Sequence, residues 1–229
     1  MKLEKGCINS IQFYHRPNTS DLKTFEEVIG KDVYQKRNNK INKGEFWYDC
    51  GGNVGAFALL AKSKGAMVEI FEPDPFNCEM IEKNLKLNGM SAKVNQVALV
   101  HNDKKKAKLF VGKNGNYWRN SLVKNWDKKG ILVDCKNFDS ALKENNACVK
   151  MDIEGMEMPI IETTNRTFKK LIFEWSFDID PSIPRYLNII EKLEKQYDIK
   201  TSKFNFEGRT VWPQSWFPAC VNVFCYAKN

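Results

Sequence analysis

The stretch from residue 47 to residue 75, WYDCGGNVGAFALLAKSKGAMVEIFEPDP, decides the fold of this chain. It begins as an apolar strand that reaches Asp49, turns through a pair of glycines, and continues as an apolar helix that Gly65 ends. A second apolar strand follows and leads to Glu72. A glycine turn between strand and helix, with an acidic residue after the next strand, is typical of a nucleotide-binding site.

The alternation of strands and helices continues beyond this stretch. The predicted strands are residues 46–50, 66–73, 92–100, 130–138, 147–153 and 169–178. The predicted helices are residues 53–65, 75–89, 139–145 and 184–197. This alternation predicts an α/β fold, with a parallel sheet covered by helices on both faces. Residues 198–204 and 220–229 have no helix between them and should pair antiparallel at one edge. Residues 105–111 and 116–123 resemble the arms of a hairpin.

No linker interrupts the pattern, so a single compact domain is expected. Residues 1–45 are interpreted as an N-terminal extension packed on a core of residues 46–229, irregular up to Pro17 and helical from 18 to 29. The first residues, MKLEKGCINSIQF, have no apolar core of the signal-peptide type, and no run is long enough to span a bilayer. Seven cysteines without a CxxC pair indicate reduced thiols, so a cytoplasmic protein is expected.

The glycine turn favours one class of nucleotide over another. Gly51 and Gly52 permit positive φ and the close approach of a ligand, and Glu72 follows Gly51 by 21 residues, a spacing suited to holding ribose hydroxyls. A GxGxxG fingerprint would also require glycine at positions 53 and 56, which are Asn53 and Ala56. A carboxylate at Asp49 would repel a pyrophosphate but suits the ammonium and sulfonium of S-adenosylmethionine.

A second acidic cluster is predicted at the middle of the sheet. Asp152 ends an apolar strand, Glu154 and Glu157 follow it, and Glu174 ends the next strand. Lys150 shares a strand face with Asp152 because side chains alternate along a strand. Convergent carboxylates indicate a general base for a hydroxyl, or a site for a hard metal ion. The alternative is that Asp152 or Glu154 caps the following helix and that Glu157 is solvated.

Four motifs in order, YDCGGNVGAFALLA, IFEPDPFNCEMIEKNLKLN, NQVALV and VKMDIEGMEMPIIE, resemble the FkbM family of S-adenosylmethionine-dependent methyltransferases over residues 46–175. The resemblance implies a class I methyltransferase sheet of seven strands with the last antiparallel, and O-methylation of a sugar or glycan. It places Asp152 and Glu154 beside the transferred methyl group; Asp152 is the first choice for the base, with Glu154 or the strand-end Glu174 as the next candidates. The cofactor-binding residues would be Asp49, Gly51, Gly52, Asn53, Gly55, Glu72, Pro73, Gln96, Val97 and Asp152.

Two acceptor classes stay open. A sugar, nucleotide-sugar or glycan would bind aromatic faces, and the candidate aromatic residues with their neighbouring arginine are Tyr117, Trp118, Arg119, Trp126, Trp212, Trp216 and Phe217, unless these are edge packing. The net charge of +8 is concentrated in residues 101–130, where nine Lys or Arg meet two Asp. That block also suits a single-stranded nucleic acid, as in an RNA 2′-O-methyltransferase with Lys150 near the methyl group. The alternative is that the basic block of residues 101–130 forms only a solvated face. The sequence leaves metal dependence and oligomeric state open.

Overall fold

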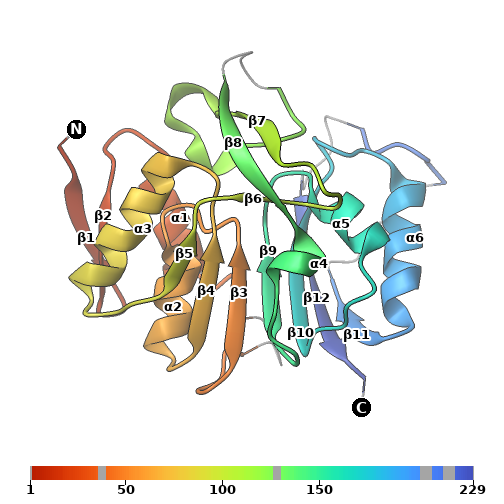
Figure 1. The fold of residues 1–229 in the computed structure, drawn as a ribbon, viewed down its shortest axis with the longest axis horizontal. Helices are drawn as coiled ribbons and strands as arrows, with labels where there is room; N and C mark the ends of the chain where they lie inside the picture. Colours follow the sequence, from red (N-terminus) through yellow and green to blue (C-terminus); the bar gives the residue numbers. More distant parts are fainter. Residues whose placement is uncertain (1, 36–39, 126–129, 202–207, 214–219, 229) are drawn as a thin grey trace.

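A computed structural model describes residues 2–35, 40–125, 130–201, 208–213 and 220–228. Its centre is a seven-stranded sheet in the order β11-β12-β10-β9-β3-β4-β5 (Figure 1). The strands are β3 (Phe46–Cys50), β4 (Met67–Phe71), β5 (Lys93–Asn95), β9 (Cys148–Met151), β10 (Lys170–Ser176), β11 (Tyr197–Lys200) and β12 (Cys220–Ala227). β12 is antiparallel to both β10 and β11, whereas β3, β4, β5, β9 and β10 are mutually parallel. The predicted class I methyltransferase sheet is confirmed.

Helices cover both faces of this sheet, as expected. The helices are α1 (Asp21–Phe25), α2 (Ala56–Ser63), α3 (Pro75–Leu87), α4 (Phe138–Ala141), α5 (Glu157–Thr163) and α6 (Ile183–Glu194). Two separate apolar clusters form, and neighbouring residues of β3 belong to different ones: Trp47 belongs to the cluster that includes α2 and α3, and Tyr48 to the cluster that includes α5 and α6. Side chains alternate across a strand, so a sheet buried on both sides needs the continuous apolar runs that the sequence shows.

Local signals explain where the helices begin. Gly55 stands before α2 with φ of 89°, which favours glycine, and Gly65 follows the helix with φ of 81°. Asp74 caps α3, its carboxylate accepting a hydrogen bond from the Phe76 backbone N–H at 2.9 Å, and Pro75 occupies the first helical position. These glycine, cap and proline positions fix the turns that follow β3 and β4.

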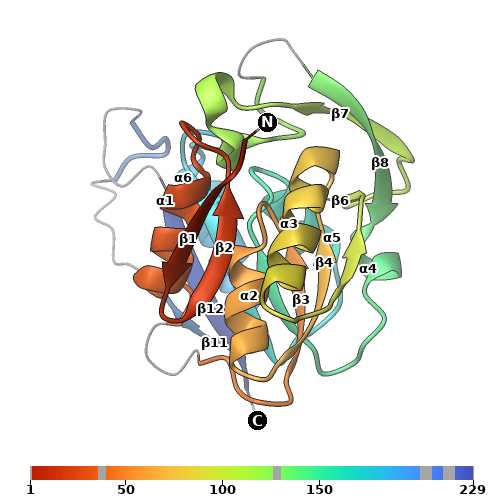
Figure 2. The ribbon, with the colours of Figure 1, turned by 90° about the vertical axis from the view of Figure 1, so that its left-hand side faces the viewer.

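The N-terminal residues are not irregular, and that prediction is wrong. β1 (Glu4–Ile8) and β2 (Ile11–His15) form an antiparallel hairpin around Asn9 and Ser10, whose φ values are 50° and 67°. Positive φ at both turn residues matches the twist of a two-residue hairpin. Asn84 of α3 and Asn88, which caps its C-terminus, accept hydrogen bonds from backbone N–H groups of β2, so the hairpin lies beside α3 (Figure 2). α1 continues as one π-helical turn, η1 (Glu26–Gly30). The division of the chain at residue 45 stays a prediction.

A small second sheet lies above the carboxyl ends of the central strands (Figure 1). Its order is β6 (Ala98–Val100), β8 (Gly130–Asn137), β7 (Lys106–Phe110). Residues 92–100, expected as one strand, therefore divide between two sheets. The hairpin expected within 105–123 is also wrong, since β7 pairs with β8 and residues 116–123 make only a bridge at Ser121. Positive φ at Asn114 and Gly115 curls that segment into short turns, η2 (Lys113–Gly115) and η3 (Tyr117–Arg119).

All seven cysteines are free thiols; five are buried, and Cys7 and Cys220 are exposed. Across the described parts of the chain, no helix combines the length and the apolar character needed to cross a membrane.

Candidate active site

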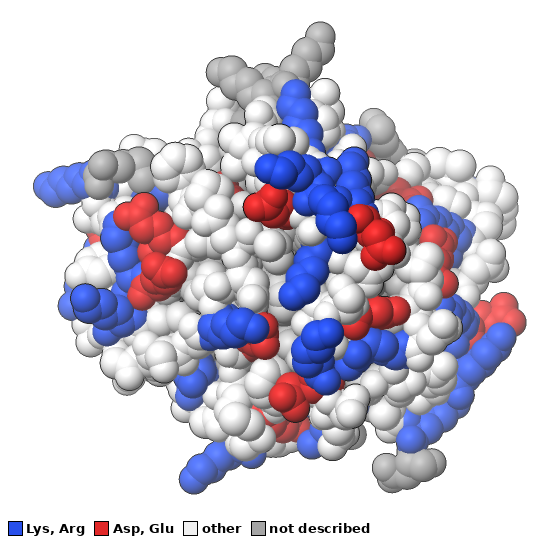
Figure 3. All heavy atoms as spheres, viewed as in Figure 1, with Lys and Arg blue, Asp and Glu red and all other residues white. Residues whose placement is uncertain are grey.

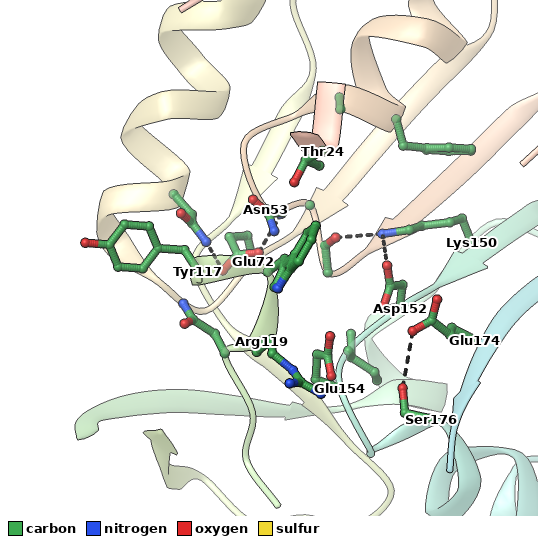
Figure 4. A pocket seen from close by; sticks show the side chains of 18 of the residues that line it. Thr24, Asn53, Glu72, Tyr117, Arg119, Lys150, Asp152, Glu154, Glu174 and Ser176 are labelled. Atoms are coloured by element: carbon green, nitrogen blue, oxygen red, sulfur yellow. Dashed lines mark hydrogen bonds and ion pairs between the residues drawn. The ribbon is translucent and has the colours of Figure 1, made fainter. Parts of the chain in front are cut away.

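A cavity of about 780 Å³ opens at the carboxyl ends of β3, β4, β9 and β10. Residues of the N-terminal segment, the segments that follow β3, β4 and β9, and the β7–β8 connection line it together. Ligands of open α/β sheets bind at this edge, and the volume suits a nucleoside cofactor together with a small acceptor. Figure 4 shows Glu72 and Asn53 on one side of the cavity and Asp152, Glu154 and Glu174 on the other.

The glycine turn lies directly against the end of β9. Gly51 has φ of 83°, and a Cβ atom added there would lie 1.9 Å from the backbone oxygen of Asp152. Added to Gly52, a Cβ would lie 2.4 Å from Cγ2 of Ile70. Gly51 is therefore required by the backbone itself, whereas Gly52 meets the end of a side chain. The turn brings the expected cofactor site next to the first acidic strand end.

Glu72 anchors the far side of the turn. It is 4% exposed, and its carboxylate accepts hydrogen bonds from the backbone N–H groups of Asn53 at 2.7 Å and Asp74 at 3.0 Å. Burial raises the pKa of Glu72 to about 7, although those N–H groups oppose the shift. A carboxylate can accept about four hydrogen bonds, which leaves capacity for ribose hydroxyls. The Oδ1 of Asn53 is buried without a hydrogen-bond partner among the described residues, and Asn53 lines the cavity.

Asp49 lies behind the turn rather than in the cavity wall. It is fully buried, and its Oδ1 is 3.2 Å from Nζ of Lys150, which also donates a hydrogen bond to the backbone oxygen of Gly51 at 2.7 Å. Burial raises the pKa of Asp49, and the charge of Lys150 acts in the opposite direction. The carboxylate predicted to meet the cofactor is thus already paired with a buried cation.

Some of the other predicted cofactor-binding residues line the cavity, and others lie outside it. Pro73 and Val97 line the cavity together with Gly51, Gly52 and Asn53. Gly55 caps α2 and does not line it, and Gln96 is exposed outside it. A contact from Gln96 to adenine stays a prediction.

The second acidic cluster forms as the sequence suggested. Asp152, Glu154 and Glu174 line the cavity, and one carboxylate oxygen of each lies within 4.8 Å of the others. Burial and the neighbouring carboxylates raise the pKa of Glu154 well above its ordinary value and that of Glu174 to about 8. Ser176 Oγ donates a hydrogen bond to Glu174 at 3.2 Å. An all-oxygen donor set of this kind fits Mg²⁺ or Ca²⁺, which would replace the protons.

Helix capping does not explain the acidic cluster. Neither Asp152 nor Glu154 caps α5, whose N-cap residue Met156 has no side-chain cap. Glu157 is not solvated: it is 2% exposed and accepts hydrogen bonds from the backbone N–H groups of Ile153 and Gly155. Glu157 thus shapes the loop that carries Glu154.

Lys150 is held as a permanent cation. Burial works to lower its pKa, but the charges of Asp49 and Asp152 outweigh that effect and raise the pKa above its ordinary value. Lys150 Nζ lies 3.9 Å from Asp152 Oδ2 (Figure 4). A lysine with a raised pKa is a poor general base.

The aromatic residues fall into two groups. Tyr117, Trp118 and Arg119 line the cavity. The guanidinium of Arg16 lies over the Tyr117 ring at 4.3 Å. Trp212 is instead a core residue, 5% exposed and stacked on Phe177 with ring centroids 4.3 Å apart, so its expected place on the pocket rim is wrong. Trp126, Trp216 and Phe217 lie outside the described residues.

Sequence reasoning missed the contribution of the N-terminal segment. Lys23, Thr24, Glu27 and Tyr34 line the cavity, and the Tyr34 hydroxyl donates a hydrogen bond to Asp152 Oδ2 at 2.8 Å. Tyr34 stands in the polar run VYQKRNNKINKGE, and no local pattern marks it as a site residue.

The chain matches the protein-family model described as Methyltransferase FkbM domain over residues 49–199, more than half of its length. No curated protein matches it. Solved structures of similar fold include TYW2 from P. horikoshii in complex with MeSAdo, 13% identical, covering 97% of this chain and 69% of that one, with a TM-score of 0.46. The tRNA (uracil-54, C5)-methyltransferase of Pyrococcus abyssi is 13% identical over 100% of this chain and 45% of that one, with a TM-score of 0.49. Precorrin-6y C5,15-methyltransferase from Geobacter metallireducens is 11% identical, covering 93% and 92%, with a TM-score of 0.47.

Proposed function

Because the chain belongs to the FkbM family of methyltransferases, we propose that it transfers a methyl group from S-adenosylmethionine to a hydroxyl of a sugar or glycan. The observation that carries this proposal is the contact between the two halves of the cavity. The Gly51 turn, which would hold the cofactor, lies against the backbone of Asp152, the first carboxylate of the acidic cluster. A methyl donor in the turn and a hydroxyl beside the cluster would therefore be neighbours.

Each half of the cavity has a proposed task. Gly51, Gly52 and Asn53 would lie along the methionine end of the cofactor, with Glu72 on the ribose, and Pro73 and Val97 toward the base. When bound, S-adenosylmethionine supplies an electrophilic methyl group, which leaves for the acceptor oxygen while its sulfur keeps the electron pair of the broken bond. Asp152 takes the hydroxyl proton, and the walls hold the oxygen in line with the methyl group, where geometry dominates the rate.

Charge at the acceptor end favours a sugar hydroxyl over RNA. Asp152, Glu154 and Glu174 gather there, and Arg119, the one cavity-lining cation that residues 101–125 contribute, is already paired with Asp178. A cluster of carboxyl groups offers phosphate no cation, and each group that ionises would repel it.

The lysines of residues 101–125, the described part of the basic block, do not line the cavity. On β7 the lysines face solvent while Ala107 and Leu109 are buried, and Figure 3 shows Lys and Arg gathered over this outer region with Asp and Glu among them. Lys106 pairs with Asp134 there, at 3.5 Å. This supports a solvated face. The RNA 2′-O-methyltransferase remains the second candidate, supported by Tyr117 and Trp118 in the cavity wall.

Free thiols support a cytoplasmic location.

The first experiment is calorimetric titration of the purified protein with S-adenosylhomocysteine and with NAD. We expect binding of S-adenosylhomocysteine alone and its loss in Glu72→Ala, with Glu69→Ala on the outer part of β4 as the matched control. Binding of neither ligand would contradict the proposal. Methyl-labelled S-adenosylmethionine would then be used to screen sugars, nucleotide-sugars, glycans and RNA at two salt concentrations, since phosphate contacts weaken steeply with salt.

A further inference from the structure

The N-terminal segment reaches the proposed reacting centre through one side chain, Tyr34. Its hydroxyl donates a hydrogen bond to Asp152 Oδ2 at 2.8 Å, although the two residues are 118 positions apart. Tyr34 lies before residue 49, where the match to the family model begins. It is 5% exposed, so this is an interior contact at the cavity wall.

The surroundings of Tyr34 fix its ring independently of Asp152. The ring packs edge-on against Phe57 of α2, with centroids 5.7 Å apart, and Lys150 Nζ lies 5.7 Å from the ring centroid. The side chain of the next residue is held as well: the Gln35 amide donates to Asp32 at 2.7 Å and accepts from the Ile41 N–H at 3.0 Å. Because the ring and the residue beside it are both held, the hydroxyl is presented to Asp152 in a fixed direction.

The two oxygens of Asp152 are therefore in different situations. Oδ2 accepts the Tyr34 hydroxyl and faces the Lys150 ammonium at 3.9 Å. Oδ1 has no hydrogen-bond partner within the described residues. A carboxylate with one oxygen fixed can turn only slightly, so its second oxygen keeps one direction in the cavity.

We propose that Tyr34 is a positioning residue: it holds Asp152 Oδ2 so that Oδ1 faces the place of the transferred methyl group and the acceptor hydroxyl. This inference rests on the proposed function of the cavity. It also assigns a task to the segment that precedes the family match, which would complete the site by supplying the hydroxyl that orients the base.

The test uses sinefungin, an analogue of S-adenosylmethionine with an ammonium group in place of the methyl-bearing sulfonium, beside S-adenosylhomocysteine, which lacks the methyl group. A carboxylate oxygen facing the methyl position should make the protein prefer sinefungin. The ratio of the two dissociation constants therefore reports the direction of Asp152 without any acceptor. We expect the wild type to prefer sinefungin and Asp152→Asn to lose that preference.

In Tyr34→Phe, which keeps the ring against Phe57, the preference should fall by about five-fold or more, the size expected for the loss of one ordinary hydrogen bond. Binding of S-adenosylhomocysteine should stay within about two-fold of the wild type. Tyr48→Phe is the matched control, because its hydroxyl accepts two backbone N–H groups near Lys143, remote from the cavity. It should lower stability and leave the preference unchanged.

An unchanged preference in Tyr34→Phe would overturn the inference, and so would an equal loss of both ligands, which indicates a structural role only. A wild type that binds S-adenosylhomocysteine without preferring sinefungin would also overturn it, while leaving the proposed cofactor intact. A wild type that binds neither ligand would instead refute the proposed function, and the inference with it.

Discussion

Replacing Lys150 by methionine should destabilise the fold strongly, because the change leaves a buried charge without its partner. Asp49 is fully buried and Lys150 is 4% exposed, with 3.2 Å between Oδ1 and Nζ. Removing one member of a buried ion pair costs about 3–5 kcal/mol. A chain of this size loses about 2–4 °C of melting temperature per kcal/mol, so the midpoint should fall by about 6–20 °C.

The stability lost in Lys150→Met should grow as pH rises. Without Lys150 nothing opposes the burial that raises the pKa of Asp49. Folding raises the pKa of this carboxyl group, so the folded protein keeps the proton at pH values where the unfolded chain has already released it. The folded protein therefore becomes less stable as pH rises above about 4, the pKa of an aspartate in the unfolded chain. The deficit of Lys150→Met against the wild type should therefore be smaller near pH 5 than near pH 8.

Urea unfolding followed by tryptophan fluorescence at these two pH values measures the effect, and the double variant Asp49→Asn/Lys150→Met is the control. Removing both charges should recover most of the lost free energy, because a neutral pair carries no unpaired buried ion. A Lys150→Met protein that unfolds at the wild-type urea concentration would refute the reasoning. A double variant no more stable than the single one would do so as well.

Other substitutions and conditions test separate features of the site. Gly51→Ala should lose about 2–5 kcal/mol of unfolding free energy, from left-handed strain and a clash with backbone, and Gly52→Ala about 1–3 kcal/mol, from overpacking against the buried Ile70 side chain; denaturant titration compares them. The unfolding free energy of the wild type should fall as pH rises from about 5 to about 8, because burial raises the pKa of Glu72 to about 7 and of Glu174 to about 8 and the unfolded chain releases those protons earlier. If the acidic cluster binds a cation, millimolar Mg²⁺ should raise the melting temperature of the wild type and not of Glu174→Gln; equal rises in both would place the ion elsewhere.

The sequence predicted the central sheet because its signals are local. Strands buried on both faces read as continuous apolar runs, and each helix boundary carries a glycine, proline or cap within a few residues. The two acidic strand ends could be placed together for the same reason, since the carboxyl ends of parallel strands share one edge. Asp152 and Glu174 needed only the topology to be brought into one cavity.

Features that depend on tertiary contacts escaped prediction. Tyr34 reaches Asp152 only because the N-terminal turn folds over α2, and Trp212 is buried only because Phe177 lies beneath it. The β1–β2 hairpin is different, since IQFYH alternates and Asn9 with Ser10 suits a two-residue turn. The sequence therefore carried a signal for this hairpin, but the alternating segment was short and polar residues flanked it.

The pairing of Asp49 with Lys150 changes how the two halves of the site should be understood. Lys150 contacts Asp49, the Gly51 carbonyl and Asp152 Oδ2 at once, so one buried cation joins the glycine turn to the proposed base. Because the Gly51 turn is also in van der Waals contact with the Asp152 backbone, neither can shift without the other. A cofactor that settles into the turn would therefore fix the position of the base, and the N-terminal Tyr34 would fix its orientation.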